Sequence, residues 1–307
     1  MSRPVACVTG GTGMIGSYIV DGLVSRGFLV RMLSRKNIDP DRNVQIFRGG
    51  LGDAECLARL MHGAQFVFHC AAELNDERTM HEVNVEGTRL VVHAARSAGI
   101  TYFCHLSSVG VIGRTCLKTV DETTPCSPQN EYEKSKLESE KIVASMMEDY
   151  GAVILRPTNV VDETHPGILS LPERGSLSDR LKVFLTGREC AHLVHARNVA
   201  AAALFFIDRP FERVERYIVS CDGEPMDTLS ELWPLYKAFR RGESDEKAAA
   251  LPGLPLAVPY ILRKILRGTG NMGDVRYSAR KLLDAGFVFP LGLKETVRRI
   301  AEAHCSV

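Results

Sequence analysis

The stretch ACVTGGTGMIGSYIV, residues 6–20, decides the fold of this protein. A strand-like apolar run leads directly into Gly10, Gly13 and Gly16, and a helix-like run follows. A dinucleotide site needs glycines at such a junction: one permits a turn with positive φ, one lets the backbone approach a pyrophosphate, and one lets the helix pack on the strand. The helix N-terminus would then face the phosphates. The alternative is a glycine-rich turn that binds no ligand.

The first 160 residues alternate between strand-like and helix-like runs. Strands are expected at 5–10, 28–34, 43–49, 65–72, 102–108 and 152–158. Helices are expected at 13–26, 53–61, 81–98 and 130–149. Repeated strand–helix–strand units with short apolar strands predict a parallel sheet that is covered on both faces. The expected class is therefore α/β, with a Rossmann-like doubly wound sheet.

The pattern loosens after Pro157. Residues 162–187 are rich in Pro, Gly and Ser, and later helices are expected at 198–207, 228–240, 255–267 and 293–304, with a strand at 216–220. We therefore expect a dinucleotide-binding domain over 1–160. A smaller, mixed substrate lobe is expected over 161–307, with residues after 190 completing part of the sheet.

Charge and cysteine usage narrow the class of protein. A net charge of +1 provides no electrostatic footprint for nucleic acid. The nine cysteines form no CxxC pair, so we expect neither a metal site nor a disulfide framework. A strand expected almost at Met1 leaves no room for a signal peptide, and the apolar stretch 251–262 is too short to span a bilayer. We expect a soluble, cytoplasmic protein without a membrane span.

Tyr132 and Lys136 form the second chemical motif. They stand four residues apart in YEKSK and so share one face of the expected helix. A free Tyr ionises near pH ~10, too high for acid–base work at neutrality. A neighbouring ammonium and a cationic nicotinamide would both lower that pKa. Tyr132 would then exchange a proton with a substrate hydroxyl or carbonyl. This spacing also arises by chance, but the glycine loop and an upstream serine favour the catalytic interpretation.

These motifs resemble the extended branch of the short-chain dehydrogenase/reductase superfamily, the NAD(P)-dependent epimerase/dehydratase group. The similar segments run from residue 6 to about residue 290 and include TGxxGxxG, YxxxK, LSSVGVIG, VNVEGT, LRPTNVV, ARNVAAAAL and RYSARKLLDAGF. Such motifs are specific for the fold and the cofactor but say little about the substrate.

The resemblance implies three catalytic residues, Ser108, Tyr132 and Lys136. Ser108 lies three residues before Val111, where the family places the hydroxyl that orients the reacting oxygen, and Ser107 is expected to be structural. The family lysine also holds the nicotinamide ribose. The resemblance assigns cofactor contacts to Gly10, Thr12, Gly13, Met14, Ile15, Arg35, Lys36, Leu51, Asp53, Ala71, Ala72, Asn84, Tyr132, Lys136 and Pro157. Asn84 has the alternative role of a helix cap.

The end of the second strand favours NADP as the cofactor, with NAD as the alternative. Enzymes of this fold that prefer NAD often carry an Asp or Glu there for the ribose 2′-OH. This strand ends instead in Ser34, Arg35 and Lys36, and a guanidinium suits a 2′-phosphate. The other interpretation of Arg35 and Lys36 is a solvated basic turn.

The reaction type follows by elimination. Ser108 is followed by Val109 and Gly110, which lack the acidic pair of the family's dehydratases and the cysteine of its fucose-forming epimerase. Redox chemistry at a carbinol or keto carbon remains. Asn159 and Arg276 stand where sugar-nucleotide enzymes contact the substrate diphosphate, and with Ser108 they are the expected substrate-binding residues. Asn159 could instead satisfy a loop backbone, and Arg276 could be a surface charge.

Three functions stay open. The favoured one is hydride transfer at C4 of a nucleotide-activated sugar, by a ketoreductase rather than a 4-epimerase. The alternative is a dehydrogenase or reductase of an apolar alcohol or ketone, similar to 3β-hydroxysteroid or dihydroflavonol enzymes, which the apolar segment LPLAVPYILRKIL favours. The third is a non-catalytic NADP sensor, against which the intact Ser108, Tyr132 and Lys136 argue. We also expect a homodimer formed through the helices at 81–98 and 130–149.

Overall fold

A computed structural model of the chain describes residues 3–37, 43–173, 177–209, 212–245, 248–267 and 273–305. The chain forms two compact units. Unit 1 contains Met1–Gly113, Cys126–Pro157 and Val199–Tyr217. Unit 2 contains Arg114–Pro125, Thr158–Asn198 and Ile218–Val307. The units are not divided at one point: 199–217 belong to unit 1 and its large sheet, and 114–125 belong to unit 2 and contain one of its strands.

The core of unit 1 is a seven-stranded sheet in the order β10-β7-β5-β4-β1-β2-β3. Its strands are β1 (Val5–Thr9), β2 (Leu29–Ser34), β3 (Val44–Arg48), β4 (Phe66–His69), β5 (Tyr102–Leu106), β7 (Ala152–Pro157) and β10 (Val214–Val219), the last of which ends in unit 2. The pairings from β7 across to β3 are all parallel. Strands buried on both faces need apolar residues at successive positions, and β1, β5 and β7 have them.

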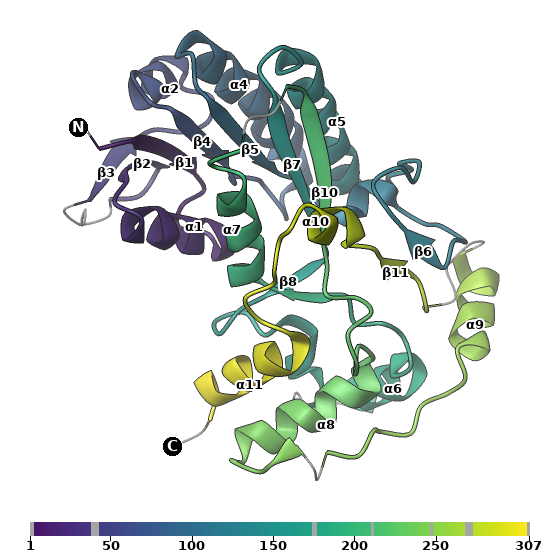
Figure 1. The fold of residues 1–307 in the computed structure, drawn as a ribbon. Coiled ribbons are helices and arrows are strands. Elements are labelled where there is room, and N and C mark those ends of the chain that lie inside the picture. The colour runs from purple at the N-terminus through teal and green to yellow at the C-terminus, as the bar shows by residue number, and fades with distance from the viewer. Residues whose placement is uncertain are drawn as a thin grey trace. The chain divides into compact units, whose positions relative to one another are not determined.

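Helices cover both faces of this sheet (Figure 1). On one face, α2 (Ala54–Met61), α4 (Gly87–Ser97) and α5 (Glu131–Met146) bury an apolar cluster against the strands. On the other face lie α1 (Met14–Ser25) and α7 (Ala196–Phe205), which begins in unit 2. Leu204 of α7 packs against Gly22 of α1. The predicted doubly wound α/β architecture is confirmed.

The strand order reverses direction between β1 and β4. From β1 the chain builds outward through β2 and β3, and it then returns to add β4 on the other side. In open parallel sheets, ligands bind at the carboxyl ends of the strands beside such a switch point. This geometry directs attention to the segments that follow Thr9 and His69.

The helix expected at 81–98 begins earlier and is interrupted. α3 (Glu77–His81) leads into the π-helical turn η1 (Glu82–Glu86), and α4 follows without a break. A π turn inserts an extra residue into the helical ladder and is frequent at functional sites. A short 3₁₀ segment, η2 (Val109–Ile112), follows β5.

Unit 2 is built from short strand pairs and helices (Figure 1). β8 (Asn159–Val161) pairs in parallel with β9 (Leu193–His195), and β6 (Thr119–Val120) pairs in parallel with β11 (Arg276–Tyr277). The helices are η3 (Gly167–Glu173), α6 (Leu177–Thr186), α8 (Leu229–Arg240), α9 (Ala257–Arg267), α10 (Arg280–Asp284) and α11 (Leu293–Ala303). The Pro-, Gly- and Ser-rich segment 162–187 thus contains η3 and α6 among its described residues. Trp233 of α8 is buried, and its indole N–H donates to the Ile168 carbonyl at 2.9 Å.

In the part of the chain that the structure describes, no helix combines the length and the apolar character needed to cross a membrane.

Candidate active site

The turn between β1 and α1 can be made only by glycine at two positions. Gly10 has φ +69°, and a Cβ there would lie 2.6 Å from the Ala71 backbone nitrogen. A Cβ on Gly16 would lie 2.1 Å from the Gly10 carbonyl oxygen. The first glycine therefore lets β1 end directly against the segment after β4, and the second lets α1 pack on the turn.

The N-terminus of α1 is free of side-chain capping. Its N-cap is Gly13, which makes no side-chain capping bond, and the first turn holds no acidic residue. Thr12 is exposed, and Met14 and Ile15 form the start of the helix. Uncapped N–H groups beside a close glycine turn suit the pyrophosphate of a dinucleotide. The residues present at this junction thus fit such a cofactor.

The end of β2 places two exposed cations beside the sheet. Ser34 is buried, and its hydroxyl accepts from the Lys36 backbone N–H at 3.1 Å. Arg35 and Lys36 themselves are exposed. The turn is therefore fixed by Ser34, while the two basic side chains extend into solvent at the carboxyl end of the strand.

Asp53 and Leu51 have structural contacts in addition to their predicted cofactor role. Asp53 is the N-cap of α2, and its Oδ1 accepts from the Cys56 N–H at 2.9 Å. Leu51 packs on Gly87 at the start of α4, where a Cβ would lie 2.9 Å from the Leu51 Cβ. The capping bond uses Asp53 Oδ1, and Asp53 Oδ2 takes no part in it.

A buried histidine joins the ends of β1 and β4. His69 Nδ1 lies 2.7 Å from Thr9 Oγ1, and His69 Nε2 lies 2.9 Å from Thr88 Oγ1 on α4. Burial, together with the nearby Lys136 ammonium, lowers the pKa of His69 to about 3, so the ring is neutral. The Ala71 N–H also donates to Thr9 Oγ1 at 3.3 Å. Ala71 and Ala72 follow as half-buried residues next to the glycine turn.

Asn84 lies in the π turn and connects the segment after β4 to α5. Its amide Oδ1 accepts from the Glu73 N–H at 2.7 Å, and its Nδ2 donates to the Glu73 carbonyl and to Ser135 Oγ. The Asn84 carbonyl accepts from Thr88 and Ser139. Of the two roles open from the sequence, the structure thus shows a hydrogen-bond network rather than a helix cap.

Ser108 and Tyr132 meet at the carboxyl end of β5. The Ser108 hydroxyl acts to lower the pKa of Tyr132, and Ser108 Oγ accepts from the Gly110 N–H at 3.1 Å. Tyr132 sits in the first turn of α5, which Asn130 caps through a bond from the Glu133 N–H. The cap and the 3₁₀ turn therefore set where the two hydroxyls lie.

Lys136 is buried one turn beyond Tyr132. Its Nζ donates to the Leu106 carbonyl at 2.5 Å, at the end of β5. Burial lowers the pKa of Lys136 to about 8. The structure thus brings Ser108, Tyr132 and Lys136 together in unit 1, at the same end of the sheet as the glycine turn.

The expected lowering of the Tyr132 pKa is not seen in the protein alone. Burial raises this pKa, the Ser108 hydroxyl acts against that rise, and the charge of Glu133 adds to it. The Lys136 Nζ donates to the Leu106 carbonyl. The chain's own residues therefore keep Tyr132 as a neutral phenol.

Sequence reasoning missed the two buried histidines at this end of the sheet. His105 is paired in register with His69, their ring centroids are 5.2 Å apart, and both His105 nitrogens lack a hydrogen-bond partner among the described residues. Burial lowers the pKa of His105 well below its usual value. The signal was present: a polar residue stands at the carboxyl end of each of two otherwise apolar strands.

The end of β7 carries a buried ionic cluster. Glu140 accepts from Arg156 at 2.7 Å and from the Ser107 hydroxyl at 2.5 Å, and Arg216 lies 3.3 Å from the same carboxylate. Ser107 is thus held by Glu140. Pro157 is the last residue of β7 and is buried.

Asn159 and Arg276 lie in unit 2, and both are engaged there. Asn159 Nδ2 donates to the Ala191 carbonyl at 2.9 Å, and its backbone N–H donates to the His192 carbonyl. The Arg276 guanidinium forms an ion pair at 3.1 Å with Asp227, which is nearly buried. Asn159 therefore satisfies the loop backbone, and Arg276 is paired rather than a free surface charge.

A histidine–aspartate pair in unit 2 adjoins these two residues. His192 has φ +54°, and its Nδ1 lies 2.7 Å from Asp222 Oδ2. The same oxygen accepts from the Tyr277 N–H at 2.8 Å, and the Tyr277 ring meets the imidazole edge to face. A non-glycine residue in the left-handed region is held there by such surrounding contacts.

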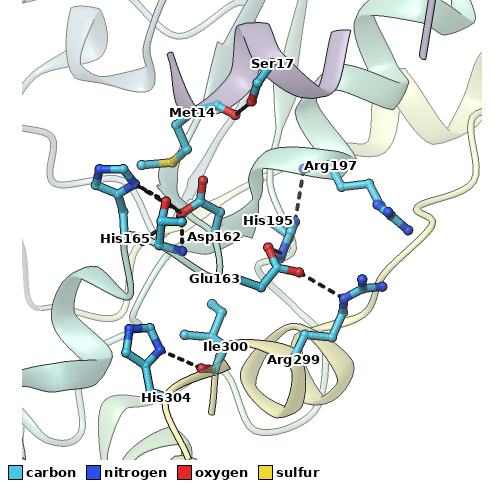
Figure 2. Close-up of polar contacts among 11 residues, drawn as sticks. Met14, Ser17, Asp162, Glu163, His165, His195, Arg197, Arg299, Ile300 and His304 are labelled. Carbon is cyan, nitrogen blue, oxygen red and sulfur yellow. Dashed lines mark hydrogen bonds and ion pairs between the residues drawn. The ribbon is translucent and has the colours of Figure 1, made fainter. Parts of the chain in front are cut away.

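The segment after β8 is tied to β9 and α11, as Figure 2 shows. Asp162 accepts from the His165 N–H at 2.7 Å and lies 3.2 Å from its Nδ1, while the His165 side chain is exposed. Glu163 lies 3.4 Å from the buried His195 Nε2 and 3.1 Å from Arg299. These carboxylates hold a turn and a helix in place.

Comparison with known proteins agrees with this geometry. Residues 6–220 match the model of the NAD dependent epimerase/dehydratase family. The chain is 28% identical to sterol demethylase protein B of Methylococcus capsulatus, over 73% of each protein. It is 30% identical to the decarboxylating sterol-4-alpha-carboxylate 3-dehydrogenase of Dictyostelium discoideum, over 83% of this chain and 81% of that one.

A solved structure shares the fold. It is a short-chain dehydrogenase/reductase superfamily protein from Agrobacterium tumefaciens with bound NAD, and it superposes with a TM-score of 0.73 at 22% identity over 97% of this chain and 96% of that chain. The family match covers most of the chain, including the glycine turn and all three catalytic candidates. The chain therefore belongs to the NAD dependent epimerase/dehydratase family and is an NAD(P)-dependent enzyme of the extended short-chain dehydrogenase/reductase type.

Proposed function

We propose that this enzyme is an NADP-dependent dehydrogenase or reductase that acts at a carbinol or keto carbon of an apolar substrate. The observation that carries the redox assignment is the placement of Ser108 directly after β5, with Tyr132 and the buried Lys136 one turn apart on α5 and Lys136 Nζ bonded to the last residue of β5. All three groups lie at the end of the sheet where the glycine turn leaves an uncapped helix N-terminus.

The chain's own residues would handle the proton and the orientation of the substrate. The bound nicotinamide would supply or accept the hydride. Ser108 would donate a hydrogen bond to the reacting oxygen, and Tyr132 would give that oxygen its proton during reduction or take it during oxidation. The Lys136 ammonium would favour the phenolate that remains. Because Tyr132 is a neutral phenol in the protein alone, it is ready to act as the acid for ketone reduction.

The proposed cofactor is NADP. Support comes from the exposed Arg35 and Lys36, which with Ser34 end β2 and include no carboxylate to meet a ribose 2′-OH. Gly10, Gly13 and Gly16 would admit the pyrophosphate, and Met14 and Ile15 provide N–H groups of the first helical turn.

The contacts of Asn159 and Arg276 favour an apolar substrate and reverse the order of preference reached from the sequence. The Asn159 amide nitrogen donates to the Ala191 carbonyl, and the Arg276 guanidinium forms an ion pair with Asp227. A diphosphate would have to compete with both contacts. The two curated relatives named above carry sterol names, which agrees with an apolar alcohol or ketone.

A direct assay distinguishes an apolar ketone substrate from a nucleotide-activated sugar. We expect the purified enzyme to oxidise NADPH in the presence of an apolar ketone, such as a 3-ketosteroid, with a fall in absorbance at 340 nm. A panel of sterol and aryl ketones and their alcohols covers both directions of the reaction. Absence of turnover across the panel, together with activity on a 4-keto nucleotide sugar, would overturn the substrate assignment.

The second candidate remains hydride transfer at C4 of a nucleotide-activated sugar. The exposed Asn159 and the half-exposed Arg276 favour it, because both reach solvent in unit 2. Under this function UDP, GDP or CDP would stabilise the protein by occupying a diphosphate site. A thermal-shift screen of these nucleotides tests it, with the Arg276→Met variant as control: stabilisation that disappears in this variant would establish the sugar-nucleotide function.

Self-association through α4 and α5 and a cytoplasmic location stay predictions. Light scattering of the purified chain measures the first, and fractionation of cells that express it measures the second.

A further inference from the structure

Exposed apolar side chains are concentrated on two helices of unit 2. The described part of the chain has fourteen exposed large apolar residues, and seven belong to α6 and α9. The seven, here called the α6–α9 patch, are Leu177, Leu181, Phe184, Val258, Ile261, Leu262 and Ile265. Single exposed apolar residues are ordinary, whereas a concentration on neighbouring helices marks an interaction site.

The patch residues of α9 form one stripe. They stand at 258, 261, 262 and 265, which is the i, i+3, i+4, i+7 spacing of one helix face, and their exposed fractions run from 36% to 73%. The opposite face is attached to the protein: Pro259 is buried, and Arg263 forms an ion pair at 2.7 Å with Glu189. The helix therefore turns its polar anchor inward and its apolar stripe outward, the reverse of an ordinary surface helix.

The patch residues of α6 repeat this arrangement. Leu177, Leu181 and Phe184 have the spacing i, i+4, i+7 and are 43% to 83% exposed. α6 and α9 contact each other, and the segment that enters α9 is tied to α6 by the bond from the Leu254 N–H to the Phe184 carbonyl at 3.2 Å. The two stripes thus belong to neighbouring helices of one unit.

The charge on these helices indicates the partner. Their sequences contain five basic residues and one acidic residue, Asp179, although the whole chain has a net charge of only +1. Lys182 and Lys264 are exposed beside the stripes. Amphipathic helices with basic polar faces lie in the interface of anionic membranes, where the apolar face enters the acyl boundary and the cations meet lipid phosphates.

We propose that the α6–α9 patch docks unit 2 on an anionic phospholipid surface. The inference stands apart from the proposed substrate, because lipid binding needs neither cofactor nor turnover. A second copy of the chain is the less favourable occupant, since joining two such patches would bring like charges together. Docking would also place the enzyme where apolar alcohols and ketones partition.

The experiment is sedimentation of the full-length protein with vesicles of phosphatidylcholine containing 30% phosphatidylglycerol. We expect binding to these vesicles, weak binding to pure phosphatidylcholine, and release as salt is raised. The double variant I261S/I265S should reduce the partition coefficient by at least roughly tenfold, because it removes two large apolar side chains from the exposed stripe that would enter the acyl boundary. The matched control L283S/V288S changes two exposed apolar residues elsewhere in unit 2 and should bind as the wild type does.

The charge variant K182E/K264E keeps the proposal testable if the apolar variant fails to fold. It leaves the stripes intact and should weaken binding to the anionic vesicles alone. Equal binding by wild type and I261S/I265S, or no binding by wild type, would overturn the proposal. A concentration-dependent dimer that I261S/I265S disperses, in protein that ignores vesicles, would overturn it too and assign the patch to a second copy.

Discussion

Unit 1 and unit 2 use their polar side chains for different ends. In unit 1, buried polar groups converge on one end of the parallel sheet, where Thr9, His69 and Lys136 surround the turn after β1 and the end of β5. In unit 2, polar groups fasten loops to helices: the buried Asn198 bonds to the backbone N–H and carbonyl of Leu291, and the half-buried Glu163 pairs with Arg299.

This difference between the polar side chains of the two units indicates which unit can carry out chemistry. A parallel sheet brings the carboxyl ends of several strands to one edge. Motifs that are far apart in the sequence therefore meet there because each follows a strand. The described part of unit 2 has two short strand pairs, and polar residues such as Arg276 and Asp227 pair with each other there. Under the proposed function the chemistry belongs to unit 1, while unit 2 exposes the α6–α9 patch.

The largest expected effect comes from Tyr132→Phe. Removing one hydroxyl should lower turnover by roughly 10²- to 10⁴-fold, because proton transfer is lost, while folding and cofactor affinity persist. Steady-state kinetics and NADPH fluorescence titration measure the two quantities. Ser135→Ala on the same helix is the control, since Ser135 bonds to Asn84 rather than to Ser108. Wild-type turnover in the Phe variant would remove the catalytic role from unit 1.

Gly10→Ala should destabilise the protein and abolish dinucleotide binding. The positive φ costs about 1–2 kcal/mol for a residue with a Cβ. The close approach to Ala71 should add about 1–3 kcal/mol of overpacking. Gly27→Ala separates the two causes, because Gly27 also has positive φ but no atom lies within 4 Å of its added Cβ. Denaturant unfolding with and without NADPH measures the free energy of unfolding and its increase on cofactor binding. Equal losses of unfolding free energy in Gly10→Ala and Gly27→Ala would contradict the account of the close turn.

Arg35→Glu should weaken NADPH binding by roughly tenfold to a hundredfold, because a charge-assisted hydrogen bond is replaced by repulsion. NADH binding should change little. Parallel fluorescence titrations with both cofactors give the ratio, and Arg3→Glu, an exposed arginine outside the site, controls for net charge. A wild-type preference for NADH would show that the end of β2 is only a solvated turn.

The pH profile should show a smaller effect with a definite sign. Burial lowers the pKa of Lys136 to about 8, so its ammonium is present below that pH and is lost above it. We expect kcat/KM to fall by up to about tenfold per pH unit above pH ~8. The raised pKa of Tyr132 keeps that phenol from titrating in the same range. Lys136→Arg should remove the fall near pH ~8, since a guanidinium keeps its charge. A profile that stays flat to pH ~10 in the wild type would contradict the role of Lys136.

The sequence predicted unit 1 better than unit 2 for physical reasons. Glycine spacing and four-residue spacing on a helix are local, so Gly10, Tyr132 and Lys136 could be read directly. The hydrogen bond that keeps Lys136 on the Leu106 carbonyl depends on how α5 lies over β5, which spacing does not reveal. In the protein alone burial raises the Tyr132 pKa, whereas the expected lowering also needs the charge of a bound nicotinamide.

The expected substrate-binding residues show more clearly what sequence position cannot predict. Asn159 and Arg276 were matched by motif position, but their actual partners, Ala191 and Asp227, come from segments far away in the sequence. The pair of His192 and Asp222 likewise joins two loops, and neither residue carries a local signal. Tertiary partners of this kind decide whether a polar side chain is available to a ligand.

The most direct test of the central claim is transfer of an isotopic label. The enzyme would be given an apolar ketone with NADPH that carries deuterium at C4 of the nicotinamide, in separate experiments with the label on each face. We predict that one labelled cofactor places a single deuterium on the carbinol carbon of the product, and that Tyr132→Phe reduces this transfer by at least roughly a hundredfold. Interconversion of a nucleotide sugar without consumption of NADPH, and no deuterium in any apolar product, would contradict the account.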